Sequence, residues 1–220
     1  MPILLISLVF SGTIFVLFPE IDLAVSGYFY NAEMGKFPLR DNLIAIIIYK
    51  SIYVLSYTLG ISLTLSLLFK KIGNKWLKDK LSFVTNRQVL FLMIIMAAGP
   101  GVIIHNVFKP NFERPRPVNT QEFGGSLEFS SAWKIGQGGK SFASGHAAMG
   151  FFMVAFAHLA KGKRRKKLYM TGFTFGIIVS MGRVVQGAHF LSDVVTGGLI
   201  TLITIQLFYI IMYKKVKKPK

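Results

Sequence analysis

The segment GRVVQGAHFLSDVVTGGLITLITIQLFYIIMYKK, residues 182–215, decides the fold of this chain. It joins a short polar stretch to an apolar run from Phe190 to Tyr213, in which Asp193 is the single charged residue. A transmembrane α-helix needs about 20 mostly apolar residues, and this run is that long. The segment therefore predicts a membrane-spanning helix with polar groups at its beginning and lysines after its end.

Five earlier apolar runs have the length of a span or nearly so. Together with the first, they predict an all-α integral membrane protein with six transmembrane helices in a bundle. No internal repeat or soluble region interrupts the pattern, so residues 1–220 are expected to form a single domain. The six expected spans are Pro2–Phe18, a part of Leu43–Phe69 that starts near Ser51, Val89–Phe108, His146–Ala160, Leu168–Gly182 and Phe190–Tyr213. The stretch Leu43–Tyr49 is either an interfacial helix or the outer end of a long second span.

Composition agrees with burial in lipid. The chain is 52% hydrophobic and 16% charged, with a mean hydropathy of +0.52, whereas soluble domains carry about 25% charged residues. The formal net charge of +17 could indicate a nucleic-acid binder. Most of the basic residues, however, fall in three short stretches beside apolar runs, which is typical of membrane proteins and argues against nucleic acid as a partner. The absence of cysteine excludes disulfides and thiolate metal sites.

The basic stretches also predict an orientation. They are Lys70–Arg87, Lys161–Lys167 and Lys214–Lys220. Six spans place all three, and both termini, on one side of the membrane, which the positive-inside rule makes the cytoplasm. The opposite side receives residues 19–42, 109–145 and 183–189.

Three segments on that opposite side carry residue types that bind or transfer phosphate. In the last of them, His189 and Asp193 are four residues apart at the beginning of a span, so they share a helix face. A carboxylate there can accept a hydrogen bond from Nδ1 of the imidazole and leave Nε2 as a nucleophile. Arg183 precedes this pair; taken alone, it could equally be an interfacial anchor.

The other two segments are SFASGH, residues 141–146, and KPNFERPRP, residues 109–117. Ser144 and Gly145 precede an apolar helix whose free N–H groups would form an anion site, although Ser-Gly alone is more often an ordinary cap. His146 adds a candidate general acid beside them. In the first segment Lys109, Arg114 and Arg116 form a cationic cluster stiffened by prolines, and cations on the translocated side run against the topology rule. Three such segments on one face predict phosphoryl transfer.

These motifs resemble the type 2 phosphatidic acid phosphatase (PAP2) superfamily, whose pattern is Lys-x6-Arg-Pro, Pro-Ser-Gly-His and Ser-Arg-x5-His-x3-Asp. The resemblance implies that His189 attacks phosphorus, that Asp193 orients it, and that His146 protonates the leaving oxygen. It implies no cofactor and no metal. The residues that it implies for holding the phosphate are Lys109, Arg116, Ser144, Gly145 and Arg183.

The chain departs from the family pattern at two positions. Ala143 stands in place of the usual proline, which is expected to loosen the loop before the helix. Gly182 stands in place of the usual serine, which removes one hydrogen bond to phosphate. Neither departure removes a charged or titrating residue, so activity is still expected.

The run from Glu113 to Gly125 is similar to the branch of bacterial lipid A 1-phosphatases. That resemblance implies the 1-phosphate of lipid A as substrate, a place in the bacterial inner membrane and an active site facing the periplasm. Arg114, Lys134 and Lys140 would then contact the polyanionic headgroup. Phosphatidylglycerophosphate and undecaprenyl pyrophosphate are alternative substrates, and a transporter that holds an anionic lipid is an alternative of another class. The sequence leaves the oligomeric state open, as well as the choice between hydrolase and phosphotransferase.

Overall fold

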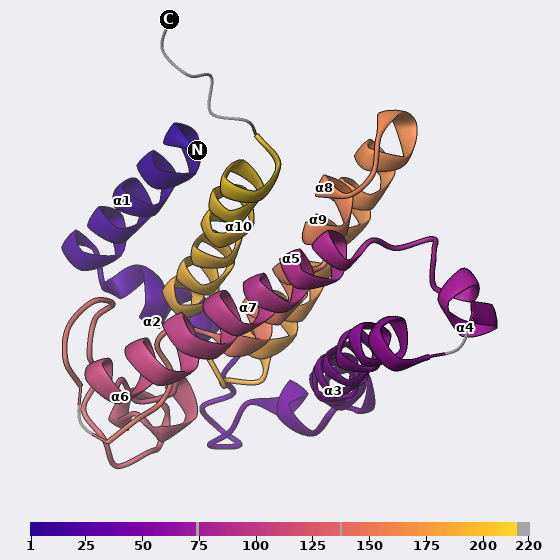
Figure 1. Ribbon diagram of the computed structural model, residues 1–220. Helices are drawn as coiled ribbons and strands as arrows, with labels where there is room; N and C mark the ends of the chain where they lie inside the picture. Colours follow the sequence, from indigo (N-terminus) through magenta and orange to yellow (C-terminus); the bar gives the residue numbers. More distant parts are fainter. Residues whose placement is uncertain (74, 137, 215–220) are drawn as a thin grey trace, which may run out of the picture.

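The protein is almost entirely helical in the computed structural model, which describes residues 1–73, 75–136 and 138–214 (Figure 1). Two isolated β-bridges are the only extended pairings among these residues. The α-helices are α1 (Pro2–Leu17), α2 (Glu20–Tyr28), α3 (Leu43–Ile72), α4 (Lys75–Lys80), α5 (Asn86–Met96), α6 (Lys109–Phe112), α7 (Gly145–Phe152), α8 (Ala155–His158), α9 (Gly162–Val185) and α10 (Leu191–Tyr213). Three short 3₁₀ turns cover Pro38–Asp41, Pro117–Asn119 and Gln121–Phe123.

Four helical segments of the described chain are long and apolar enough to cross a membrane. They are α3, α9, α10 and the segment that begins with α5, and they make this a multi-pass membrane protein. A fifth crossing is counted if α1 and α2, which are bent by 85° at their junction, form one span. The structure therefore gives four to five candidate spans where the sequence predicted six.

Two differences from the predicted spans have local causes. The second span is one continuous helix from Leu43 to Ile72, capped by the Asn42 side chain, so Leu43–Tyr49 is its outer end and not a separate interfacial helix. The expected fourth span, His146–Ala160, is divided between α7 and α8 by the turn at Met153 and Val154. Neither piece reaches the length of a span.

The third span begins with α5, where Thr85 and Gln88 form a capping box. It continues as a π-helix from Ala97 to Phe108 and then as α6. Pro100 lies inside the π-helix, where it removes one backbone N–H donor, and wider turns of this kind accommodate such a loss. The segment thereby carries Lys109 to the level of the loops at one end of the bundle.

Helix α7 lies at the centre, packed against α9 and α10. Glycines allow the backbones to approach closely: a Cβ atom on Gly150 would lie 3.0 Å from Cα of Gly176, and one on Gly198 would lie 2.7 Å from the Phe151 ring. Small residues at helix contacts are the usual means of packing in membranes, where lipid removes most of the hydrophobic driving force. This packing fixes the start of α7 beside the start of α10.

Candidate active site

The polar loops gather at the end of the bundle where α9 ends and α10 begins. His189 lies in the turn between these helices and is 1% exposed. Its Nδ1 lies 3.5 Å from Oδ2 of Asp193, as the four-residue spacing predicted. Because Nδ1 faces the carboxylate, Nε2 is the ring nitrogen left to act on a substrate.

Ser141 completes the immediate surroundings of this pair. Its hydroxyl donates to Oδ2 of Asp193 at 2.5 Å and lies 3.3 Å from Nδ1 of His189. The backbone N–H of Phe190 also donates to Oδ2, at 2.9 Å. Asp193 is thus held by fixed donors, which orient its carboxylate toward the histidine.

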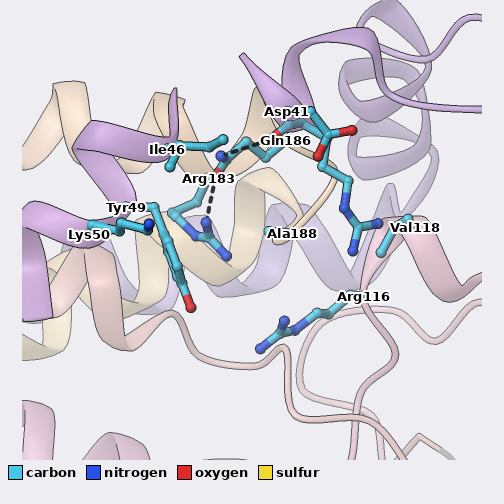
Figure 2. A pocket seen from close by; sticks show the side chains of 10 residues that line it. Asp41, Ile46, Tyr49, Lys50, Arg116, Val118, Arg183, Gln186 and Ala188 are labelled. Carbon is cyan, nitrogen blue, oxygen red and sulfur yellow. Dashed lines mark hydrogen bonds between the residues drawn. The ribbon is translucent and has the colours of Figure 1, made fainter. Parts of the chain in front are cut away.

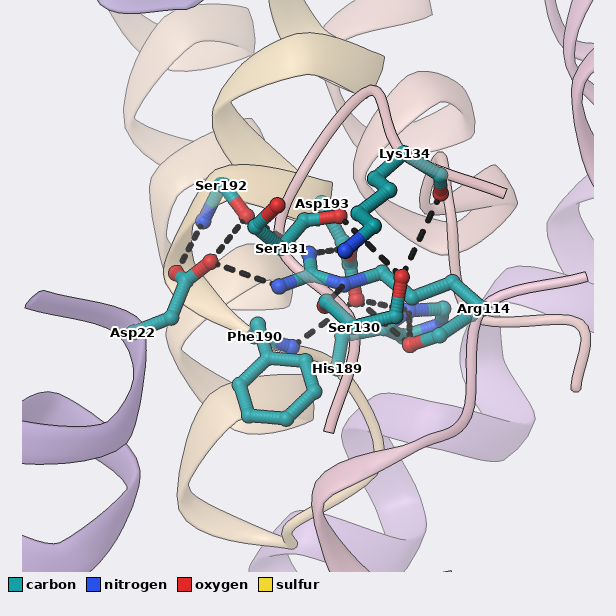
Figure 3. Close-up of polar contacts among 10 residues, drawn as sticks. Asp22, Arg114, Ser130, Ser131, Lys134, His189, Phe190, Ser192 and Asp193 are labelled. Carbon is teal, nitrogen blue, oxygen red and sulfur yellow. Dashed lines mark hydrogen bonds and ion pairs between the residues drawn. The ribbon is translucent and has the colours of Figure 1, made fainter. Parts of the chain in front are cut away.

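Arg114 is fully buried and ties the site together (Figure 3). Its Nη1 donates to Oδ1 of Asp193 at 2.5 Å, and its Nη2 donates to Oδ2 of Asp22 at 2.8 Å. Its Nε donates to the carbonyl of Ser130 at 2.7 Å, and its planar group lies over the ring of Phe190, 4.4 Å from the centroid. The expectation that Arg114 contacts a lipid headgroup is therefore wrong, because the buried side chain donates to acceptors inside the protein and forms an internal ion-pair network.

Asp22 brings α2 into this network. It is fully buried and accepts three kinds of donor: the Arg114 guanidinium, the backbone N–H of Ser192 at 2.9 Å and the Ser192 hydroxyl at 2.5 Å. Arg114 Nη1 also donates to the Ser192 hydroxyl at 2.7 Å. The first turn of α10, which carries Asp193, is therefore anchored to the N-terminal part of the chain.

The start of α7 lies against the same turn. Ser144 caps α7 through its side chain, which accepts from the N–H of Ala147 at 3.3 Å, and its own N–H donates to the carbonyl of Asp193 at 3.0 Å. Gly197 makes this approach possible, because a Cβ atom there would lie 2.5 Å from the carbonyl oxygen of Ser144. The positive end of α7, with Gly145 at its first position, thus meets the His189 turn.

His146 follows on α7 and contacts two adjacent tyrosines of α3. Its ring stacks on Tyr49 at 4.9 Å between centroids and meets Tyr53 edge-on at 5.2 Å. Its Nε2 is buried and has no hydrogen-bond partner among the described residues. A histidine with a fixed ring and an unpaired nitrogen is arranged to exchange a proton with a ligand.

Arg183 also contacts Tyr49, the tyrosine that stacks on His146. Its guanidinium lies over the Tyr49 ring, 4.5 Å from the centroid, and Nη1 donates to the Gln186 side chain. Gln186 in turn donates to the carbonyl of Arg40 at 3.3 Å. The Nε of Arg183 is buried without a partner in the described structure, so one donor of this cation remains for an anion.

A cavity of about 400 Å³ opens beside Arg183 (Figure 2). Arg116 and Arg183 both project into it, and Tyr49 and Gln186 form part of its wall. Its ten lining residues include four cations and a single carboxylate; they are Arg40, Asp41, Ile46, Tyr49, Lys50, Arg116, Val118, Arg183, Gln186 and Ala188. The cavity is therefore suited to an anionic group.

The lysines differ in their positions. Lys109 donates from Nζ to the carbonyl of Lys140 at 2.8 Å, and its charge acts on both His146 and Asp193. Lys134 and the Lys140 side chain are exposed at the surface of the loop. Among the described residues, no group of three or more His, Asp or Glu side chains is arranged to hold a metal ion.

Burial controls the protonation of the nucleophile candidate. Removal from water lowers the pKa of His189 to about 4, although the neighbouring Asp193 carboxylate acts in the opposite direction. The imidazole is consequently neutral at physiological pH, which is the state in which Nε2 carries a free lone pair.

The structure brings His189, Asp193, His146, Ser144, Gly145, Lys109, Arg116 and Arg183 to one end of the bundle. Sequence reasoning missed Asp22, Ser141 and Ser192 in the ion-pair network, and Arg40 and Tyr49 in the cavity. For Asp22 a signal existed, since a carboxylate that enters an otherwise apolar stretch, two residues after the exposed Glu20, requires a partner. For Ser141 and Tyr49 nothing in the local sequence set them apart.

Comparison with known proteins assigns the family. Residues 88–217 match the PAP2 superfamily. A lipid A 4′-phosphatase of Francisella tularensis subsp. novicida (strain U112) is 30% identical over 219 residues, which cover 94% of this chain and 92% of that protein. Lipid A 4′-phosphatases of Rhizobium etli and Rhizobium leguminosarum are 26% and 34% identical over 86% and 48% of this chain, and over 78% and 46% of their own lengths. No solved structure matches the chain.

Proposed function

The chain belongs to the PAP2 superfamily and is a membrane phosphatase, and on this premise we propose that it removes a phosphate from lipid A through a phosphohistidine intermediate, without a metal. The observation that carries the proposal is that two histidines lie at the same end of the bundle as a cavity suited to an anion. His189 is held by Asp193, His146 has an unpaired nitrogen, and Arg116 and Arg183 line the cavity.

The first chemical step is attack by Nε2 of His189 on phosphorus. As the N–P bond forms, the bond from phosphorus to the sugar oxygen breaks, and His146 donates a proton to that oxygen. Asp193 stabilises the positive charge that develops on His189, and the Ser141 hydroxyl holds the carboxylate in place. In the second step water attacks phosphorus and gives a proton to His146 as the N–P bond to His189 breaks. Phosphate leaves, and both histidines return to their starting protonation states.

The charges of the phosphoryl oxygens require cations and N–H donors. Arg183 offers its unpaired Nε, and Arg116 and Lys109 offer further positive charge. Ser144 and the Gly145 N–H at the start of α7 complete the proposed phosphate site. Burial and these cations lower the pKa of His146, and the negative charge of a bound phosphate group acts in the opposite direction, which allows His146 to hold the proton that it donates.

The names of the three relatives favour the 4′-phosphate of lipid A, and we propose this position. The 1-phosphate, expected from the Glu113–Gly125 run, is the second candidate. The outer cations Arg40 and Lys50 of the cavity are placed to contact the rest of a polyanionic headgroup, a role in which Lys134 and Lys140 can assist.

From the distribution of basic residues we propose six crossings, with both termini in the cytoplasm of a bacterium and the active site at the periplasmic face of the inner membrane. The start of α7 lies beside Asp193 of α10, and the end of α8 lies beside Tyr209 of α10, where His158 contacts it. The pair α7–α8 therefore runs alongside α10 over most of the length of α10. We propose it as the remaining crossing, with α1–α2 as another. Because the chain contains no cysteine, single cysteines at Glu128 and at Lys163 test the orientation with an impermeant maleimide. Labelling of Glu128→Cys alone in intact cells with a permeabilised outer membrane is expected, and labelling of Lys163→Cys alone would reverse the orientation.

We further propose that residues 1–220 work as one domain, although the family match begins at residue 88. Asp22 and Tyr49 lie before that boundary and contact Arg114 and His146. A fragment that lacks them would have a buried arginine with one carboxylate missing and a histidine without its stacking partner.

The experiment that tests the function is phosphate release by the purified protein in detergent, with a chelator present and His189→Ala as control. The substrates are lipid A, phosphatidylglycerophosphate, undecaprenyl pyrophosphate and phosphatidic acid. Release from lipid A well above the others, lost in the variant, is the expected result. Preference for another lipid would make that lipid the substrate in place of lipid A. Binding of a lipid without release of phosphate from any of the four would favour a carrier of anionic lipids.

The cleaved position follows from the chemistry of the product. The 1-phosphate of a sugar is an anomeric ester, which mild acid hydrolyses, whereas the 4′-phosphate is an ordinary ester that resists it. A monophosphorylated product that loses its remaining phosphate in mild acid was cleaved at the 4′ position. A product that keeps it was cleaved at the 1 position.

A further inference from the structure

A second cavity with basic lining lies far from the catalytic loops. Its volume is about 460 Å³, and it is enclosed by the end of α8, the start of α9, the end of α10 and the start of α5. The lining residues are Gln88, His158, Leu159, Ala160, Lys161, Gly162, Arg165, Tyr209 and Tyr213. Two of them are cations and none is acidic, so the cavity favours an anion.

The lengths of two helices place this cavity at the other membrane surface. Helix α9 runs from Gly162, at the cavity, to Val185, near the catalytic turn, and α10 runs in the opposite direction from Leu191 to Tyr213. At 1.5 Å per residue each is about 35 Å long, which exceeds the roughly 30 Å of a bilayer's hydrocarbon core. Figure 1 shows the yellow end of α10 and the orange start of α9 at the top, and the loops around α6 at the bottom. The cavity therefore lies at headgroup depth in the leaflet opposite the active site.

Its polar groups are fixed in place and one is unpaired. The His158 ring lies 5.0 Å from the Tyr209 ring and 3.4 Å from the Gln206 side-chain oxygen, measured from Nε2. Tyr209 stacks on Tyr213, and the Arg87 guanidinium lies over the Tyr213 ring, 4.8 Å from its centroid. The Tyr213 hydroxyl is buried and has no hydrogen-bond partner among the described residues. A buried hydroxyl without a partner is costly, and a ligand oxygen would satisfy it.

We propose that this cavity binds a phosphate group, supplied by the headgroup of an anionic phospholipid or by free phosphate. Lys161 and Arg165 provide the charge and the Tyr213 hydroxyl provides a neutral donor. Basic pockets between transmembrane helices bind anionic headgroups in this way. The site is independent of the phosphatase reaction, because it shares no residue with the catalytic loops.

The same turn of α9 supplies a matched control. Lys163 and Arg164 are exposed and do not line the cavity, so Lys163→Gln/Arg164→Gln removes the same charge as Lys161→Gln/Arg165→Gln from the same surface. Tyr213→Phe removes the hydroxyl without changing the charge. Phosphate release from the lipid substrate is expected to stay within about twofold of wild type in all three, which verifies that each variant folds.

The measurement is binding of phosphatidylglycerol to the detergent-solubilised protein, by native mass spectrometry, with phosphatidylcholine and inorganic phosphate as the other arms. Loss of both lining cations should weaken binding by roughly thirtyfold, and loss of the Tyr213 hydroxyl by about three- to tenfold. The control double variant should change it much less. If the wild type binds phosphatidylglycerol and inorganic phosphate does not displace it, the ligand is a lipid headgroup. If inorganic phosphate displaces the lipid, the ligand is a free anion. Either result supports the site. Equal losses in the two double variants, or no binding by the wild type, would overturn it.

Discussion

Replacement of Asp22 by asparagine tests the buried network directly. Asp22 is fully buried and accepts from Arg114 and from two groups of Ser192, at 2.5 to 2.9 Å. Asparagine has nearly the same shape, but it is neutral and presents an NH₂ group to donors. Removal of one partner of a buried ion pair costs about 3–5 kcal/mol. Arg114 keeps Asp193 as a partner, so we expect the low end, ~3 kcal/mol, against a total stability of about 5–15 kcal/mol.

The assay combines unfolding of the protein in mixed micelles with steady-state phosphate release. Asp22 acts on the reaction through Arg114 and Asp193, so kcat should fall while KM changes little. Glu20→Gln is the matched control, because Glu20 is exposed two residues earlier on the same helix and its substitution removes the same charge. The control should stay within about 0.5 kcal/mol of wild type. A variant Asp22→Asn with wild-type stability and kcat would refute the view that Asp22 supports the catalytic carboxylate.

Three further predictions follow from particular contacts. Because burial lowers the pKa of His189 to about 4, the nucleophile is unprotonated above that pH, and the acidic limb of kcat/KM that belongs to it should lie near pH 4; a limb near 6.5 would mean a solvated imidazole. Gly197→Ala would put a methyl group 2.5 Å from a carbonyl of the loop before α7, so thermal unfolding should show a loss of about 1–3 kcal/mol together with lower kcat. Tyr49→Ala removes the ring that supports both His146 and Arg183 and should lower kcat/KM about tenfold, whereas Tyr49→Phe keeps the ring and should keep most activity; equal loss in both variants would assign the effect to the hydroxyl.

The apolar pattern was enough to predict the helical membrane fold, because long apolar runs have few alternatives in a chain of this size. The pattern was less informative about where a helix is interrupted or bent. The α7–α8 break falls within an apolar run, and the bend between α1 and α2 depends on Pro19 and on Asp22 meeting Arg114, which is a tertiary contact. The third basic stretch, Lys214–Lys220, lies outside the described residues except for Lys214, so the structure leaves that part of the topology argument as a prediction.

The site was predictable to the extent that its chemistry is local. His189 and Asp193 are one helical turn apart, so their contact follows from spacing alone. Arg114 was misinterpreted because a charge in a proline-rich loop is usually solvated. Its partner Asp22 is separated from it by 92 residues, and no local pattern joins them.

The two carboxylates on Arg114 explain why the N-terminal helices belong to the catalytic unit. A guanidinium that faced Asp193 alone would concentrate its positive charge on that carboxylate and weaken the field that Asp193 exerts on His189. Asp22 takes one side of the same guanidinium at 2.8 Å, and Asp193 then receives Arg114 on Oδ1 while Oδ2 faces Ser141 and His189. The arginine thus fixes the orientation of the catalytic carboxylate without cancelling its charge. Asp22→Asn should alter the net charge of the network, whereas Ser141→Ala leaves that net charge unchanged and removes one of the donors that orient and stabilise the Asp193 carboxylate.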